Sequence, residues 1–193
     1  MKLHSLLHPA PAETADLESR FHEGDMAALE EIILIHQRGI YRLGLRLFFN
    51  RDTAADFTQD VFIRAYEKCR SYNPSRPLKS WLYQVATNLG RDHLRRKKEI
   101  VVENDELSID ESAPKADELL IKDELHRNVW NVVNRLSPTY REILALRFSS
   151  DLSTKEIAAV LGIGLSAVKV RLCRGMKAFE DAYTSRGGEG YVV

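Results

Sequence analysis

The sequence contains little cysteine and no long hydrophobic run. Cys69 and Cys173 are its only cysteines, and their separation matches neither a metal-binding motif nor a disulfide framework. The longest apolar runs, such as residues 32–35, are far too short to cross a bilayer, and the N-terminus lacks the hydrophobic core of a signal peptide. We therefore expect a cytoplasmic protein that makes no membrane contact of its own and keeps its cysteines reduced.

The sequence also lacks the residue groupings that carry enzyme chemistry. It shows no clustered catalytic carboxylates, no pairing of a nucleophile with a base and no phosphate-binding loop. Its six histidines have none of the spacings that metal ligands require. We therefore expect a protein that is not an enzyme and that needs neither a cofactor nor a metal.

A net charge is absent as well, because 28 basic residues balance 28 acidic ones. Their distribution is uneven, and it says more about partners than the total does. Segment 91–98 has five basic residues against one acid, and segment 169–178 has four and no acid. The stretch 99–124 between them carries ten acids and two lysines. The zero net charge is therefore no argument against a nucleic-acid partner.

What is present is helical periodicity. Apolar residues recur at spacings of three and four, whereas alternation typical of strands never lasts more than a few residues. A first helix is expected around 29–47, and a second runs to about Arg70 with Asp52 as its N-cap. The two prolines of segment 71–77 predict a loop, after which a third helix begins at Leu78.

These patterns predict an all-α protein of two small helical domains joined by a flexible acidic linker. The expected boundaries are a flexible arm at 1–16, a first domain at 17–99, the linker at 100–117, a second domain at 118–183 and a disordered tail at 184–193.

The second domain ends in a pattern typical of a helix-turn-helix. Ser153 and Glu156 fit a capping box, and Gly162 suits the left-handed end of a short helix that begins at Thr154. After a brief turn, Ser166 is expected to cap a second helix whose outward side is basic. Such a helix fits the major groove of DNA, where its cations neutralise phosphates. The alternative is an ordinary helical hairpin with a solvated basic face.

Both halves of the sequence resemble one known family. Residues 136–148, with the capped helix pair after them, resemble the −35-binding domain of bacterial sigma factors. Residues 56–66 are similar to the stretch with which sigma factors grip the coiled coil of the polymerase β′ subunit, and residues 78–92 resemble the helix that reads the melted −10 element. Only these two domains are present, which is typical of the extracytoplasmic-function (ECF) class. The resemblance implies that the chain binds core RNA polymerase (β′ and β subunits) and promoter DNA, and that an anti-sigma factor holds it inactive.

The resemblance and the helical spacing together predict three sets of site residues. Contacts to core polymerase are expected from Asp56, Gln59 and Asp60. Contacts to the −10 element are expected from Tyr72, as a stacking surface for an unpaired base, and from Gln84, Asn88, Arg91 and Arg95. Contacts to the −35 element are expected from Ser166, Lys169, Val170, Arg171, Cys173, Arg174 and Lys177. In each set the alternative is a solvated polar helix face.

The loop before the third helix departs from the family pattern. Many relatives have an aromatic-x-glycine turn there, whereas this chain has the proline-containing segment 72–77. We expect the prolines to reshape the loop that captures a flipped base and so to change the preferred −10 sequence. The acidic linker has two possible roles: it extends in solvent, or, as the resemblance implies, it threads the polymerase channel in imitation of nucleic-acid phosphates.

Three other functions fit parts of the sequence. A regulator that binds an operator through its helix-turn-helix leaves the matches at 56–66 and 78–92 unexplained. An enzyme acting on nucleic acid lacks catalytic groups. A decoy that resembles an anti-sigma protein has no use for the basic residues of 169–177.

Overall fold

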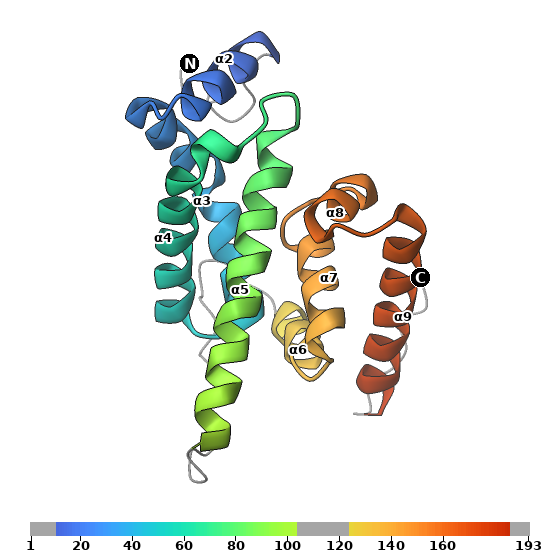
Figure 1. Cartoon of the computed structure of the whole chain (residues 1–193). Coiled ribbons are helices and arrows are strands. Elements are labelled where there is room, and N and C mark those ends of the chain that lie inside the picture. The colour runs from blue at the N-terminus through green and yellow to red at the C-terminus, as the bar shows by residue number, and fades with distance from the viewer. Residues whose placement is uncertain (1–10, 104–123, 186–193) are drawn as a thin grey trace.

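The computed structural model describes residues 11–103 and 124–185. Every regular element within these two ranges is helical, which confirms the all-α prediction. Figure 1 shows the two helical domains side by side, the first coloured blue to green and the second yellow to red. No helix in the described ranges is long and apolar enough to cross a bilayer.

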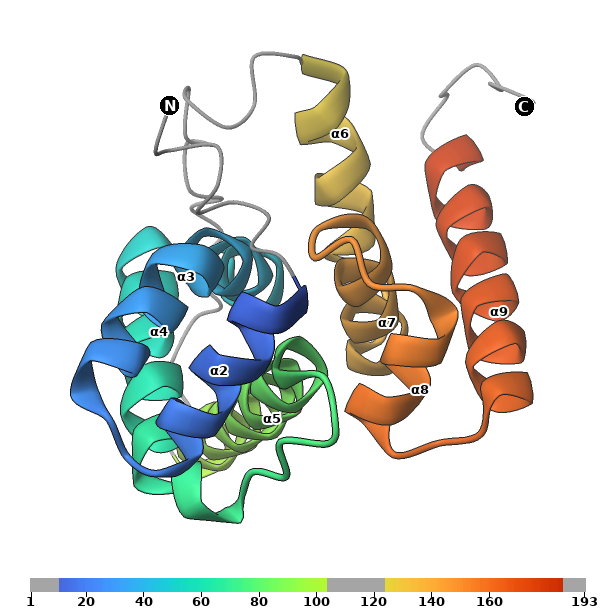
Figure 2. The same cartoon turned by 90° about the horizontal axis from the view of Figure 1, so that it is seen from above.

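The first domain is a bundle of three long helices closed at one end by a fourth. The bundle consists of α3 (Met26–Phe48), α4 (Arg51–Glu67) and α5 (Leu78–Glu103), and the short 3-10 helix η1 (Cys69–Ser71) follows α4. The fourth helix, α2 (Pro11–His22), lies across the end of the bundle, as the view from above shows (Figure 2).

Capping residues fix the start of α3 and α4. The Asp25 carboxylate accepts a hydrogen bond from the Ala27 N–H at 2.9 Å and begins α3. The N-cap of α4 is Asn50, whose side-chain oxygen accepts from the Thr53 N–H at 2.8 Å. The prediction of Asp52 as that cap is therefore wrong, and Asp52 lies in the first turn, where a negative charge suits the helix dipole.

The second domain consists of four helices, which are α6 (Glu124–Val133), α7 (Pro138–Phe148), α8 (Thr154–Leu161) and α9 (Leu165–Thr184). Its core is formed by Ile143, Leu144, Leu146, Ile157 and Val168, all of them almost completely buried. Helix α3 packs against α7, and α5 packs against α8, so one continuous apolar core joins the two domains.

Two domain boundaries differ from the prediction. Helix α2 begins at Pro11, so residues 11–16 of the expected arm are helical. Helix α5 continues to Glu103, so the first residues of the expected linker are helical as well. The remainder of the linker, the start of the second domain at 118, residues 1–10 of the arm and residues 186–193 of the tail lie outside the described residues.

Candidate functional site

Helices α8 and α9 form the expected helix-turn-helix. The Glu156 N–H donates to Ser153 Oγ at 3.2 Å and the Ser153 N–H donates to Glu156 Oε2 at 2.8 Å, which confirms the capping box. Gly162 ends α8 in the left-handed conformation with φ 65°, as predicted. The turn then directs α9 away from α8 (Figure 2).

Helix α9 begins one residue earlier than Ser166. Its first residue is Leu165, and Gly164 occupies the N-cap position without a side-chain hydrogen bond. Ser166 therefore lies in the first turn with its side chain exposed, and the prediction that it caps the helix is wrong.

The outward side of α9 carries the residues expected to contact DNA. Val168 and Gly175 are buried against the domain, and Leu172 and Phe179 are partly buried on the same side. The residues of the predicted −35 set that are exposed are Ser166, Lys169, Val170, Cys173, Arg174 and Lys177. Arg171 is half-buried, at the edge of this surface. Segment 169–178 of the helix thus presents basic side chains to solvent and contains no acid.

Helix α5 presents most of the predicted −10 set on one face. Gln84, Asn88 and Arg95 are exposed along it. Arg95 also forms an ion pair with Asp92, 3.2 Å away on the same helix. This polar face lies at the side of the bundle, and its apolar counterpart includes Leu82 and the buried Ala86.

Arg91 is held by the second domain. Its Nε and Nη2 atoms donate to the two carboxylate oxygens of Glu142 on α7, both at 2.8 Å. The Arg91 side chain is 46% exposed, whereas that of Glu142 is 9% exposed. The paired carboxylate raises the pKa of Arg91, so the guanidinium stays charged. The ion pair uses Nε and Nη2 of Arg91, so Nη1 is the nitrogen left to meet another partner.

Two further cation contacts join the domains. The Arg46 guanidinium on α3 lies 4.0 Å from the ring centre of Trp130 on α6, and that of Arg141 on α7 lies 5.2 Å from the ring centre of Phe49. Burial lowers the pKa of Arg46 to about 10. These pairs and the role of Glu142 could not be predicted from the sequence, because each partner comes from a distant segment.

Tyr72 is buried and does not present a stacking surface. Its side chain is 1% exposed, its ring packs against Phe21 and Trp81, and its O–H donates to the Arg76 carbonyl at 2.6 Å. Burial, and next Glu18, raise the pKa of Tyr72. The predicted role of Tyr72 does not fit this position, because its ring must leave the core before it can meet a base. The exposed part of the loop is 73–77.

Helix α4 carries the residues expected to bind polymerase. Asp56, Gln59 and Asp60 are all exposed, and their spacing of three and four places them on one side of the helix. Asp60 also lines a cleft of about 230 Å³ between α4 and α5. The other charged residues that line this cleft include the acid Asp92 and the base Arg64. In the described parts of the chain, no group of histidine, cysteine or acidic residues could hold a metal ion.

Comparison with known proteins matches both halves of the chain. The model of the family Sigma-70 region 2 matches residues 32–100, and that of Sigma-70, region 4 matches residues 126–179. The ECF RNA polymerase sigma factor SigW of Bacillus subtilis (strain 168) is 34% identical over 166 residues, which cover 81% of this chain and 89% of SigW. The ECF RNA polymerase sigma factor SigE of Mycolicibacterium smegmatis (strain ATCC 700084 / mc(2)155) is 29% identical over 93% of this chain and 70% of SigE.

A solved structure shares the fold. The sigma factor RpoE of Bartonella quintana, solved in complex with the anti-sigma factor NepR, superimposes with a TM-score of 0.69 at 22% identity, over 80% of this chain and 96% of RpoE. The region 2 model covers helices of the first domain and the region 4 model covers helices of the second. The similarity to SigW extends over most of both proteins. The chain therefore belongs to the ECF RNA polymerase sigma factors.

Proposed function

We propose that this chain directs promoter-specific transcription initiation with a division of labour among three helices. Helix α4 binds core RNA polymerase, α5 reads the unpaired −10 element, and α9 reads the −35 duplex. The observation that carries the proposal is the exposed basic segment 169–178 of α9, which contains no acid and follows a capped α8 and a left-handed glycine turn. Recognition is the whole of its chemistry, so the chain acts in the cytoplasm as a non-enzymatic subunit.

The promoter opens because α5 binds one state of DNA better than the other. Gln84 and Asn88 have amide side chains that can both donate to and accept from base edges, and they are exposed one turn apart. A surface that binds an unpaired strand but not the duplex shifts the equilibrium toward the open state, because only differential affinity moves an equilibrium. We expect Arg95, which is exposed behind them, to follow the sugar-phosphate backbone.

In this proposal the N-terminal part of α9 contacts bases and the part that follows contacts phosphates. Lys169 lies in the first turns of α9, where we expect side chains to reach base edges, and Arg174 and Lys177 lie farther along, where we expect them to contact flanking phosphates. We expect Lys177→Ala to weaken binding to all −35 sequences and to flatten the log–log salt slope by about one unit. Lys169→Ala should instead change which sequence is preferred. Equal, uniform losses in both variants would contradict this division.

An anti-sigma factor is the expected regulator. The proposal is supported by RpoE of Bartonella quintana, whose complex with NepR has the same sigma fold.

Co-elution with core RNA polymerase tests the central claim. The chain should co-elute with core enzyme, and Asp56→Arg with Asp60→Arg should abolish most of that binding while the protein stays folded. The matched control is Glu23→Arg with Glu30→Arg, which changes two exposed acids by the same charge outside α4. Unchanged co-elution of the α4 variant would remove these acids from the polymerase interface. Absence of co-elution in the unaltered chain would favour an operator-binding regulator instead.

A further inference from the structure

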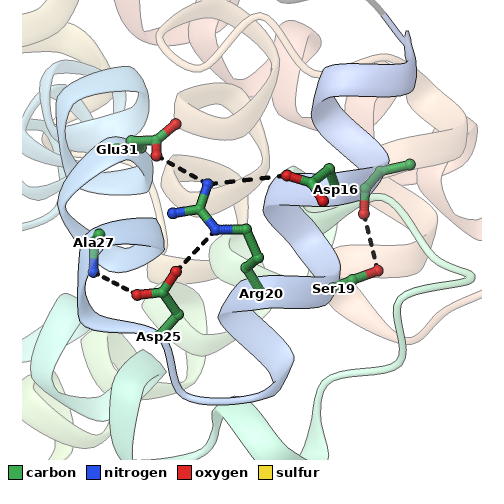
Figure 3. Close-up of polar contacts among 7 residues, drawn as sticks. Asp16, Ser19, Arg20, Asp25, Ala27 and Glu31 are labelled. Atoms are coloured by element: carbon green, nitrogen blue, oxygen red, sulfur yellow. Dashed lines mark hydrogen bonds and ion pairs between the residues drawn. The ribbon is translucent and has the colours of Figure 1, made fainter.

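Helix α2 is firmly attached to the first domain, although the matched Sigma-70 region 2 begins only at residue 32. Figure 3 shows Arg20 of α2 between three carboxylates. Its Nε lies 2.8 Å from Asp25, and its Nη1 lies 3.2 Å from Glu31 and 4.0 Å from Asp16. Because Asp25 caps α3 and Glu31 lies on its second turn, Arg20 fixes the position of α2 on the start of α3.

From this position α2 supplies the cap that α5 lacks. The Leu78 N–H, at the first residue of α5, donates to Glu18 Oε1 at 3.1 Å. The preceding residue is Pro77, which has no side-chain acceptor that could cap the helix. The first amides of a helix need acceptors and favour a negative charge, and Glu18 provides both from a separate helix.

The same helix also holds the start of the loop before α5. Phe21 is completely buried, and its ring centre lies 6.2 Å from that of Tyr72 and 5.9 Å from that of Trp81. Tyr72 and Trp81 are themselves in contact, with ring centres 5.3 Å apart. Phe21 therefore packs on both the residue that begins the loop and the helix that follows it.

Between these two attachments the loop is short and exposed. Residues 73–77 all have exposed side chains. The Asn73 side-chain oxygen accepts hydrogen bonds from the Ser75 N–H at 3.0 Å and from Ser75 Oγ at 2.7 Å, which shapes the turn locally. The path of such a short loop is determined by where its ends are held, and both ends are held by α2.

We propose that Glu18 and Phe21 are positioning residues that set the shape of loop 73–77 and thereby the base preference of the chain at the −10 element. The inference rests on the proposed function, in which the loop and α5 meet the unpaired strand. Neither residue contacts DNA. Glu18 acts through the Leu78 amide, and Phe21 acts through the ring of Tyr72.

The test is transcription by holoenzyme from a template library randomised over the −35 and −10 segments, read by sequencing the transcripts. Glu18→Ala removes the acceptor, and we expect it to change the base ratio at one or more −10 positions by about threefold or more, part of the effect of a lost base contact. Glu18→Gln keeps an oxygen that can accept from Leu78, so its −10 profile should stay close to that of the unaltered chain. Glu23→Gln is the control for a charge lost from an exposed glutamate just after α2.

The outcomes separate the inference from the function on which it rests. If the unaltered chain gives no promoter-selective transcripts with core enzyme, the proposed function is wrong. If it does, and Glu18→Ala lowers the yield from all templates equally with the base ratios unchanged, α2 supports only the fold and the inference is overturned. Should Glu18→Ala fail to fold, Phe21→Leu replaces it, because leucine fills the site but removes the ring contacts with Tyr72 and Trp81. A −10 profile unchanged in that variant also overturns the inference.

Discussion

The ion pair between Arg91 and Glu142 allows a quantitative test of how the two domains are held together. The perturbations are Arg91→Ala, Glu142→Gln and the double variant. The two side chains differ in their surroundings, since that of Arg91 is 46% exposed and that of Glu142 is 9% exposed. The two single variants should therefore have unequal effects.

The magnitude follows from which charge is left behind. Exposed ion pairs contribute about 0.2–1 kcal/mol, whereas removing one partner of a buried pair costs about 3–5 kcal/mol. Arg91→Ala leaves a buried carboxylate unpaired, and with one partner half in solvent we expect a loss of about 2–3 kcal/mol in the free energy of unfolding. Glu142→Gln leaves a guanidinium that can turn into water, and we expect a loss of about 1 kcal/mol.

Urea unfolding of the four proteins at neutral pH gives the coupling energy between the two side chains. We expect a coupling of about 1–2 kcal/mol, between the ranges for exposed and buried pairs. The matched control is the Asp92–Arg95 pair on the same helix, whose side chains are 53% and 68% exposed. Its coupling should lie below about 0.5 kcal/mol. If the Arg91–Glu142 coupling is no larger than that of the control, the ion pair does not hold the domains together and the reasoning fails.

Three further predictions concern single residues. Asn88→Ala should lower open-complex formation on duplex promoters by about tenfold or more, as the loss of a base contact does, while co-elution with core polymerase stays unchanged; full open-complex formation would make Asn88 an ordinary surface residue. Gly44→Ala should destabilise the first domain by about 1–3 kcal/mol in urea unfolding, because a Cβ there would lie 2.8 Å from Phe57 Cδ1 and 3.3 Å from the backbone of α4; an unchanged midpoint would show that α3 and α4 can separate at no cost. Burial, and next Lys79, lower the pKa of His36 to about 4, so between that pH and about 6.5 the unfolded chain binds a proton that the folded chain does not. The free energy of unfolding is therefore highest above pH ~6.5 and falls by roughly 1–3 kcal/mol as the pH is lowered. His36→Gln should remove this part of the pH dependence of stability. If the two proteins lose stability identically on acidification, His36 is not held neutral by burial.

Signals within a few residues of chain predicted the structure well. Helix α8 has its expected bounds, and both its capping box and its left-handed glycine are where the sequence placed them. Such features depend on hydrogen bonds between residues three or four apart, so the sequence contains both partners. The predicted helix starts were wrong where several residues that can cap a helix lie close together. Asn50 caps α4 in place of Asp52, and α9 begins before Ser166 could cap it.

Contacts between distant segments were not predictable in the same way. The burial of Tyr72 depends on packing against Phe21, which lies 51 positions earlier in the chain. An isolated helix as short as α2 has little stability of its own and is stabilised by packing on the domain. Its first residues were therefore predicted to belong to a flexible arm. The pairing of Arg91 with Glu142 joins residues 51 positions apart.

The sequence alone determined the helices other than α2, their order and the two basic segments of the chain, and its resemblance to sigma factors was correct for the family. The tertiary structure alone decided that Arg91 is held by the other domain, that Tyr72 is buried and that Glu18 caps α5. The physical reason is that backbone preferences and capping act within one helical turn, where neighbours in sequence are neighbours in space. Which side chains meet across helices depends instead on how the helices dock, and docking is set by the whole core at once.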